Sequence, residues 1–399
     1  MTRKIPELRF TGFSGEWEEK RLGDIAEIIT GTTPSTSVKD YYNGEKLFAS
    51  PADMGTDRYL YKTNKTLTEL GVEKSRNVRK GSTLFVCIGA TIGKLIQTTC
   101  KSAFNQQINA VVPISEYEDN YIYSLLEKNA RKITYIVSAQ TMPIINKSEF
   151  TNSKVKVING MQEQEKIGEL FETLDACLED QAAYVETLKK SKKAFLQKLF
   201  PQKGAKAPEL RFPGFEGDWG EERLFYNTKY TIGYTPSTKD NTNFGGNHIW
   251  YSIADFGDKY IEKSNRTLSD KAIRNDKLIK KGSLLLSFKL TLGELAITNV
   301  DCFTNEAIIA MNFNELRDTE FMFYNLKTIN LLKYANRAAQ GFTINSDGLN
   351  SIKIFLPSLA EQEKIGSFFK ALDEKIEKEE DKLESFERLK KALLQKVFV

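Results

Sequence analysis

The chain has 399 residues, of which 40% are hydrophobic and 28% are charged, and its formal net charge is +4. This composition is typical of a globular protein, and the absence of any run of 18 apolar residues excludes a helical membrane span. Because residues 1–5 carry charge and no apolar segment, no secretory signal is predicted and we expect a cytoplasmic protein.

An internal repeat dominates the sequence. Residues 6–22, PELRFTGFSGEWEEKRL, return as PELRFPGFEGDWGEERL at residues 208–224, a shift of 202. Residues 163–175, EQEKIGELFETLD, return as EQEKIGSFFKALD at residues 361–373, a shift of 198. A unit of roughly 200 residues is therefore duplicated, and each copy is long enough for a core of its own. We predict a first globular domain at 1–158, a helix at 159–200, a second domain at 201–356 and a second helix at 357–399.

Each globular part is predicted to be a mixed α/β module within an α+β chain. Apolar runs typical of strands at 83–88 and 108–114 are matched by runs at 283–288 and 307–313. Landmarks shared by the two copies have structural explanations: Gly31 and Gly233 each begin a G-x-T-P-S turn sequence, and Trp17 and Trp219 are predicted core anchors.

Little aligns between the copies in the polar stretches that follow these turns. They begin at Ser37 and Lys239, and the first continues to Arg79. Both mix Lys, Arg, Asn, Tyr and Thr, side chains that bond phosphates and read base edges. A duplicated frame with two unlike polar surfaces suits the recognition of two different things. Drift of unconstrained loops, or an ordinary solvated face, predicts the same pattern.

The two predicted helices carry matching heptad seams, in which apolar positions alternate by steps of four and three. The seam residues are Ile167, Phe171, Leu174, Leu178, Val185, Leu188, Phe195 and Leu199, then Ile365, Phe369, Leu372, Ile376, Leu383, Phe386, Leu393 and Val397. Even the polar interruptions match, since Gln181 corresponds to Glu379 and Lys192 to Lys390. Helices of this length rise roughly 58 Å and need a partner to bury the seam.

Charge predicts the direction of pairing. Residues 162–200 hold 8 acidic and 6 basic residues, with the acids early and the lysines late, and residues 360–398 hold 10 and 9 in a weaker gradient. Antiparallel packing sets each acidic start against a basic end. We therefore expect an antiparallel coiled coil with the two modules in an inverted, pseudo-two-fold arrangement. The alternative is two separate helices, each bound to its own module.

Several kinds of catalytic or ligand site are absent from the sequence. The stretch from Gly89 to Leu95 resembles a phosphate loop, but it has three residues between its glycines and leucine after Lys94, and Glu294 replaces that lysine in the second copy. No Pro-Pro dipeptide exists for an amino-methyltransferase motif. A single histidine, His248, and four cysteines without a C-x-x-C pair argue against a structural metal site, and one histidine cannot supply a Ser-His-Asp triad in both copies.

Taken together, these motifs resemble the specificity subunits of type I restriction-modification enzymes. The resemblance covers essentially the whole chain and rests on three motifs: W-x-x-x-x-L before G-x-T-P-S, the 81–93 region followed by Phe104-Asn105-Gln106-Gln107, and E-Q-x-K-I-G opening a long helix. The second copy departs at residues 304–307, Thr-Asn-Glu-Ala, and at residues 290–292.

The resemblance implies a non-catalytic DNA-binding subunit. In this family each module is a target recognition domain for one half of an asymmetric bipartite sequence, and the helices act as spacer and docking surface for two methyltransferase subunits. Restriction subunits with an ATP-driven motor and nuclease join the complex, so S-adenosylmethionine, ATP and Mg are expected on the partners and no cofactor on this chain.

Candidate DNA contacts follow from the polar stretches, with lysines assigned to phosphate and the others to base edges. They are Lys39, Tyr41, Asn43, Lys62, Lys65 and Arg76 in the first copy, and Lys239, Asn243, His248, Lys263, Arg266 and Arg274 in the second. A further set, Asn105, Gln106, Gln107, Gln140, Asn305 and Gln340, fits base contact and a structural role equally well. Two rival functions remain: a coiled-coil protein scaffold presenting two binding modules, and an enzyme.

Overall fold

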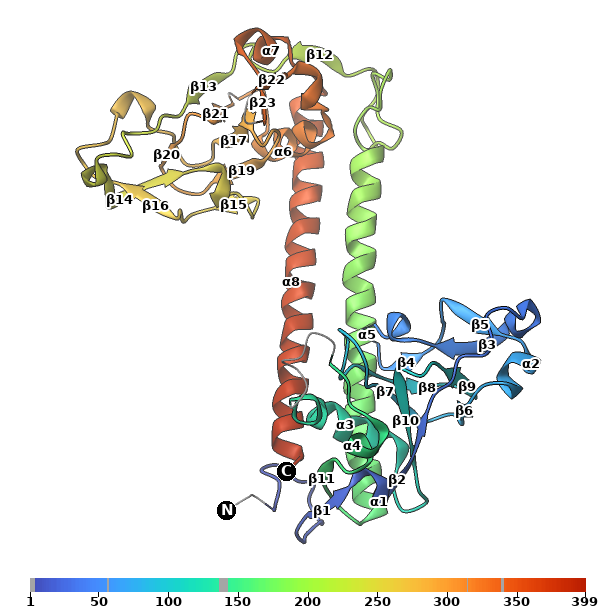
Figure 1. Ribbon diagram of the computed structural model, residues 1–399. Coiled ribbons are helices and arrows are strands. Elements are labelled where there is room, and N and C mark those ends of the chain that lie inside the picture. The colour runs from blue at the N-terminus through green and yellow to red at the C-terminus, as the bar shows by residue number, and fades with distance from the viewer. Residues whose placement is uncertain (1–3, 56, 136–142, 314, 339–340) are drawn as a thin grey trace. The chain divides into compact units, whose positions relative to one another are not determined.

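Two compact units make up the computed structural model, which describes residues 4–55, 57–135, 143–313, 315–338 and 341–399. The first unit combines Met1–Tyr184 with Glu379–Val399, and the second is Val185–Lys378. Each unit holds one globular module and one stretch of each long helix, α5 (Met161–Lys198) and α8 (Leu359–Val397) (Figure 1). Among the described residues, no helix is both long and apolar enough to cross a membrane.

The first module is built on a five-stranded sheet of order β2-β10-β7-β8-β4 and a four-stranded sheet of order β5-β3-β9-β6, with β1 and β11 paired separately. The strands are β1 (Glu18–Arg21), β2 (Ala26–Thr30), β3 (Tyr42–Ala49), β4 (Tyr59–Leu60), β5 (Lys65–Leu67), β6 (Asn77–Val78), β7 (Thr83–Val86), β8 (Leu95–Thr98), β9 (Ser102–Phe104), β10 (Ile108–Pro113) and β11 (Lys154–Val157). The helices are α1 (Leu22–Ile25), α2 (Glu69–Glu73), α3 (Asp119–Thr134) and α4 (Lys147–Thr151), with 3-10 turns η1 (Lys39–Tyr41) and η2 (Pro51–Asp53).

The central strands of this module are buried on both faces, which explains their continuous apolar sequences. On β7, Phe85 packs into the core formed with α3 and α5, whereas Leu84 and Val86 point to a smaller core on the opposite face. Successive side chains of a strand alternate between faces, so one strand supplies both cores. Trp17, at 2% exposure, and Phe398 of α8's C-terminal extension join the larger core.

The second module repeats this plan with sheets β13-β21-β17-β19-β15 and β16-β14-β20, the pair β12-β24, and an additional sheet β18-β23-β22. Its strands are β12 (Gly220–Arg223), β13 (Lys229–Ile232), β14 (Phe244–Tyr251), β15 (Tyr260–Ile261), β16 (Arg266–Leu268), β17 (Leu284–Ser287), β18 (Lys289–Leu290), β19 (Leu295–Thr298), β20 (Phe303–Thr304), β21 (Ile308–Asn312), β22 (Asn336–Ala338), β23 (Gly341–Thr343) and β24 (Lys353–Leu356). Helices α6 (Thr319–Thr328) and α7 (Ser346–Ser351) and 3-10 turns η3 (Asn241–Asn243), η4 (Ile253–Asp255), η5 (Asn275–Lys277) and η6 (Leu331–Tyr334) complete it.

Equivalent elements show that the frame repeats through the polar stretches whose sequences align poorly. The 3-10 turn η1 and strand β3 correspond to η3 and β14 at a shift of 202, and β3 and β14 have the same burial pattern. The shift falls to 200 at β10 and β21 and to 198 at the long helices. The predicted duplicated frame is therefore confirmed within these stretches: the backbone is shared and the side chains differ.

The predicted landmarks have structural roles, but the two glycines are explained by a different physical cause from the one predicted. Trp17 and Trp219 are both 2% exposed and lie in the two large cores, as predicted. Gly31 and Gly233 are needed for close approach, because an added Cβ would lie 2.2 Å from the carbonyl oxygens of Asn105 and Asn305, respectively. Turn chemistry alone does not explain these glycines.

The antiparallel direction predicted from charge is confirmed within each unit. In the first unit, Phe171 near the start of α5 packs against Phe398, just after the end of α8. In the second, Phe200, just after the end of α5, packs against Phe369 near the start of α8. Every predicted seam residue is buried or half-buried. The seam interruptions are also partnered, since Gln181 Nε2 donates to Glu379 Oε2 at 2.8 Å.

Candidate nucleic-acid interface and its mounting

Most of the predicted DNA contacts are exposed on the two modules. The exposed members are Lys39, Asn43, Lys62, Lys65, Arg76, Gln106, Lys239, Lys263, Arg266 and Arg274. Tyr41, Asn105, Gln107, His248 and Asn305 are half-buried, and Asn243 is buried. Gln140 and Gln340 lie outside the described residues.

One polar pocket gathers three predicted contacts of the first module. Lys39, Asn43 and Lys65 line it together with Thr36 and Tyr42, and its volume is about 390 Å³. The pocket lies where η1 turns into β3, and Asn43 has a left-handed backbone with φ of 63°. Asparagine is among the few non-glycine residues that adopt this conformation readily. Two lysines and an amide on one concave surface form a group of donors suited to a phosphate backbone.

Equivalent positions of the second module carry different side chains, which also have partners inside their module. His248 occupies the place of Lys46, and its Nε2 lies 2.7 Å from Asp270 Oδ1. The guanidinium of Arg266 lies 4.0 Å from the ring centre of Phe244, and Arg274 lies 5.4 Å from that of Tyr234. The two modules thus present unlike polar surfaces on the same backbone.

Three amide side chains of the predicted set are engaged within their own loops. Asn243 donates from Nδ2 to the carbonyl oxygen of Ser237 at 3.0 Å, and it is 8% exposed. Asn105 Oδ1 accepts from the backbone N–H of Gln107, and Asn305 Oδ1 accepts from that of Ala307, both at 3.1 Å. These contacts give the three asparagines a structural role in this conformation.

The polar stretches that begin at Ser37 and Lys239 contain a repeated segment that the sequence analysis did not detect. Residues 57–67, DRYLYKTNKTL, correspond to residues 258–268, DKYIEKSNRTL, at a shift of 201. The outer repeats are shifted by 202 and 198 residues, and alignment at either shift places these residues out of register. Alignment at a shift of 201 would have detected the segment. In this alignment Lys62 corresponds to Lys263, Lys65 to Arg266, and Arg58, the second residue of the segment, to Lys259.

Arg58 belongs to a buried ion cluster that joins the first module to both long helices. We call Arg58, Glu127, Asp175 and Lys390 the first anchor cluster. Arg58 Nη1 donates to Asp175 Oδ2 of α5 at 2.8 Å, with side-chain exposures of 1% and 7%. Lys390 of α8 reaches both Asp175 Oδ1 and Glu127 Oε1 of α3 at 2.5 Å. Burial raises the pKa of the Glu127 carboxyl, against the opposing effect of Lys390.

The second unit builds the same connection with changed residues. We call Lys192, Lys259, Glu320, Tyr324 and Asp373 the second anchor cluster. Lys259 Nζ lies 3.3 Å from Asp373 Oδ2 of α8 and 2.5 Å from Glu320 Oε2 of α6. Lys192 of α5 pairs with Asp373, which also accepts from the Tyr324 hydroxyl. Burial alone would raise the pKa of Asp373, but these hydrogen bonds and cations leave it lowered.

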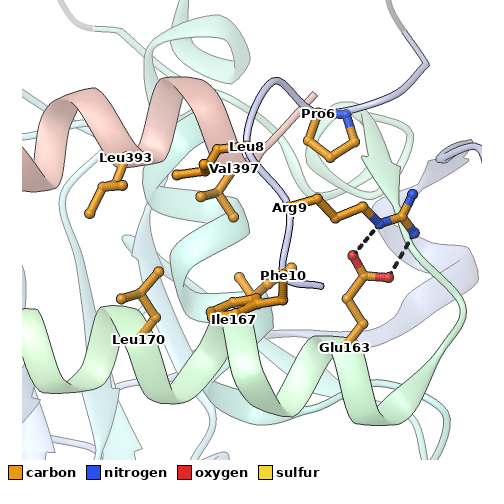
Figure 2. Close-up of a pocket in the computed structure, with 9 residues that line it drawn as sticks. All are labelled: Pro6, Leu8, Arg9, Phe10, Glu163, Ile167, Leu170, Leu393 and Val397. Atoms are coloured by element: carbon orange, nitrogen blue, oxygen red, sulfur yellow. Dashed lines mark hydrogen bonds and ion pairs between the residues drawn. The ribbon is translucent and has the colours of Figure 1, made fainter. Parts of the chain in front are cut away.

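The repeated PELRF sequence fastens the helix ends in each unit. Arg9 bonds Glu163 at the start of α5 through Nε and Nη2, both at 2.8 Å (Figure 2). The backbone N–H groups of Glu7 and Leu8 donate to the carbonyl oxygen of Lys396, at 2.8 and 2.9 Å. Carbonyl groups in the last turn of a helix lack partners within the helix, so this segment caps α8. We call residues 6–10 the first clip.

The second clip, residues 208–212, makes the equivalent contacts. Arg211 bonds Glu361 at the start of α8 through two hydrogen bonds of 2.7 Å. The backbone N–H of Leu210 donates to the carbonyl oxygen of Lys198 at 2.9 Å, which caps the end of α5. Each clip therefore ties the start of one long helix to the end of the other.

The family model for "Type I restriction modification DNA specificity domain" matches residues 14–189 and again residues 229–388. The chain belongs to this family. The first match lies mostly in the first unit and the second mostly in the second unit.

Relatives of the same family match parts or all of the chain. The type I restriction enzyme HindI specificity subunit of Haemophilus influenzae is 30% identical over 172 residues, 41% of this chain and 38% of that protein. The MjaVIII specificity subunit of Methanocaldococcus jannaschii is 21% identical over 410 residues, covering 95% and 91%. The first match thus spans well under half the length of its relative.

Two solved structures share the fold. The type I restriction-modification S subunit from M. genitalium superposes with a TM-score of 0.65 over 99% of both chains, at 16% identity. A chain from a study of complex assembly and conformational transition of the type I R-M system gives 0.57, covering 95% of this chain and 97% of that chain, also at 16% identity. At this identity the likeness extends to the fold of the specificity subunits and not to the residues that contact DNA.

Proposed function

We propose that this specificity subunit reads an asymmetric, bipartite DNA sequence, with one half-site for each module. The observation that carries the proposal is one backbone frame with unlike polar side chains at equivalent positions. Tyr41, Asn43 and Lys46 stand where the second module has Asn243, Gly245 and His248. Because base identity is read by side chains at base edges, two such surfaces suit two different half-sites.

In this proposal the subunit itself is non-catalytic and acts from the cytoplasm. The long helices hold the modules at a set spacing and dock two methyltransferase subunits, since two near-identical helices suit two copies of one partner. Restriction subunits complete the assembly. In this proposal S-adenosylmethionine, ATP and Mg bind to the partner subunits, as the family resemblance implies, and phosphate-loop and methyltransferase motifs are absent from this sequence.

Mapping methylated positions in the genome of a cell that carries the chain tests the division into half-sites. We expect one bipartite motif with an unspecified central gap. Replacing residues 37–79 alone, by those of another specificity subunit, is expected to change one half of the motif and leave the other half and the gap intact. A change in both halves would contradict one half-site per module.

Helix length provides a test of the spacer. We expect one extra helical turn between Ala182 and Lys193, together with one at the equivalent place in α8, to lengthen the gap and leave both half-sites unchanged. A changed half-site sequence would count against the proposed roles of helices and modules.

Charge removal tests the contact surface. Arg76→Ala and Arg274→Ala are each expected to weaken DNA binding and to lower the slope of log affinity against log salt by about 1 if the guanidinium neutralises a phosphate. The matched control is Lys154→Ala, an exposed lysine of β11 paired with Glu19 away from the recognition stretches. If both arginine variants kept the affinity, target sequence and salt slope of the parent, the assigned surface would be wrong.

A further inference from the structure

Each anchor cluster connects three parts of its unit. In the first, Arg58 comes from the module, Asp175 from α5 and Lys390 from α8. In the second, Lys259 comes from the module, Asp373 from α8 and Lys192 from α5. The aspartate that receives both cations is equivalent in the two repeats, at a shift of 198. The roles of α5 and α8 are exchanged between the units.

Residues around the two aspartates differ, yet the connection is kept. Arg58 is replaced by Lys259, Glu127 of α3 by Lys327 of α6, and Asn120 by Glu320. The acidic partner is therefore lost at one position of the module and gained at another. Glu320 then binds Lys259 at 2.5 Å, whereas Asn120 accepts from Arg58 at 3.0 Å. A cation from the module reaches the helix aspartate in both arrangements.

Arg58 is held from several directions, so its position is closely defined. Its Nε donates to Gln97 Oε1 at 3.1 Å and its Nη1 to Asp175, and the guanidinium lies 4.3 Å from the ring centre of Tyr123. Its backbone N–H also donates to Glu179 Oε1 of α5 at 2.7 Å. Buried ion pairs add little net stability compared with well-packed apolar residues, but they penalise any arrangement in which a charge loses its partner.

Both basic residues lie at the start of the repeated segment, residues 57–67 and 258–268. Tyr59 and Leu60 of β4 follow Arg58, and the exposed candidates Lys62 and Lys65 come next in the chain. In the second module Lys259 precedes β15, and Lys263 and Arg266 follow. A shift of either basic residue relative to the helices would therefore move the adjoining candidate contacts.

We infer that Arg58 and Lys259 are positioning residues that fix how each recognition segment leaves the helix pair, and that they set how strictly the protein measures the gap between its half-sites. The inference rests on the proposed bipartite recognition. It assigns control of the gap to two largely buried side chains, in addition to the length of the helices. Loosening one cluster should let the same half-sites be bound at a wrong separation.

The variants are chosen from the differences between the repeats. Arg58→Met and Lys259→Met keep an unbranched aliphatic side chain and remove the charge. Arg58→Lys imitates the second repeat, where lysine reaches the equivalent aspartate. Ile96→Ala is the control for general destabilisation, since Ile96 is 2% exposed and lies in the small core of the first module that includes neither long helix.

The experiment uses the full chain assembled with its methyltransferase subunits and three DNA duplexes. One duplex carries the motif found by methylation mapping, and the others have the gap shortened or lengthened by one base pair. We expect Arg58→Met and Lys259→Met to reduce the preference for the natural gap by about threefold or more, and Arg58→Lys to retain it within about twofold. Ile96→Ala should alter the affinity for all three duplexes by the same factor.

Two results overturn the inference. The first is an unchanged preference in both methionine variants, whatever happens to overall affinity. The second is a preference lost equally in Ile96→Ala, which would reduce the cluster to ordinary stabilisation. If Arg58→Met fails to assemble, Lys259→Met decides the outcome in the other unit. Failure of the proposed function is distinguishable, because the parent chain would then show no bipartite motif at all.

Discussion

The two units fasten their helix ends with the same polar contacts but pack them with apolar side chains of different size. In the first unit, Leu170 and Leu393 leave a pocket of about 270 Å³ beneath the first clip (Figure 2). Their equivalents in the second unit are Phe368 and Phe195, which meet edge to face with ring centres 5.1 Å apart. Phe212 of the second clip adds a further contact with Phe368 at 5.6 Å.

This difference separates two physical roles. The arginine–glutamate pairs and the caps on the last helical turn recur in both units, so they are the candidates for setting geometry. The apolar filling has changed between the units while the contacts above it have not. We therefore expect polar substitutions to have the same effect in both units, and apolar ones to have opposite effects.

The largest expected effect is loss of the clip arginine. Arg9→Met leaves Glu163, which has a side-chain exposure of 3%, without its guanidinium partner, and Arg211→Met does the same to Glu361 at 1%. Uncompensated buried charges cost about 3 kcal/mol or more. Hydrogen exchange of the helix ends, followed by mass spectrometry, should show a similar fall in local unfolding free energy in each unit. A large fall in only one unit would break the equivalence of the clips.

Exchange of the apolar filling should give a smaller effect of opposite sign in the two units. Leu170→Phe combined with Leu393→Phe should stabilise the first unit by about 1 kcal/mol through cavity filling. Phe195→Leu combined with Phe368→Leu should destabilise the second by about 2 kcal/mol, because it opens a cavity. Urea unfolding of the four-residue exchange and of each half of it measures both. Destabilisation by the phenylalanine pair would mean that the pocket is too rigid to fill.

The smallest expected effect is a difference in pH dependence between the anchor clusters. The folded pKa of Asp373 is lowered from 3.8, so its contribution to stability is present above that value and is lost as the pH falls through the folded pKa. The folded pKa of Glu127 is raised from 4.5, so its contribution is present at lower pH and is lost as the pH rises through the folded pKa.

Stability measured against pH should therefore separate two variants. The stability advantage of the parent chain over Asp373→Asn should shrink on acidification. The unfolding free energy of the parent relative to Glu127→Gln should rise on acidification. Protonation relieves the desolvation cost of the ionised Glu127 carboxylate in the parent, whereas the neutral amide of the variant has no such cost at any pH. Unfolding free energies of the parent and the two variants across the acid range provide the check. Parallel pH profiles for both variants would contradict the assignment.

Local patterns in the sequence were sufficient for much of the fold. The heptad seams gave both long helices, and the apolar runs gave β7, β10, β17 and β21, because periodicity and burial act over a few neighbouring residues. The repeated segment from Asp57 to Leu67 was missed because a one-residue change of shift hides it from a comparison tied to the outer landmarks.

The anchor clusters depended on information that sequence patterns do not hold. Arg58 and Asp175 are 117 residues apart in the sequence. The residues next to an arginine do not show whether the fold will bury it or leave it on the surface. Asn243 shows the converse case, since its polar character suggested a base contact while its amide serves the loop. Which polar side chains face outward is decided by tertiary packing.

The discontinuity of the first unit has a consequence during synthesis on the ribosome. Phe398 lies among Trp17, Tyr121 and Phe171, so that core lacks a central ring until the segment after α8 has been made. The second unit, residues 185–378, is contiguous and contains everything that it needs earlier. The usual order, in which the N-terminal domain matures first, is therefore expected to be reversed. The N-terminal module is therefore expected to stay incomplete until the end of α8 has left the ribosome.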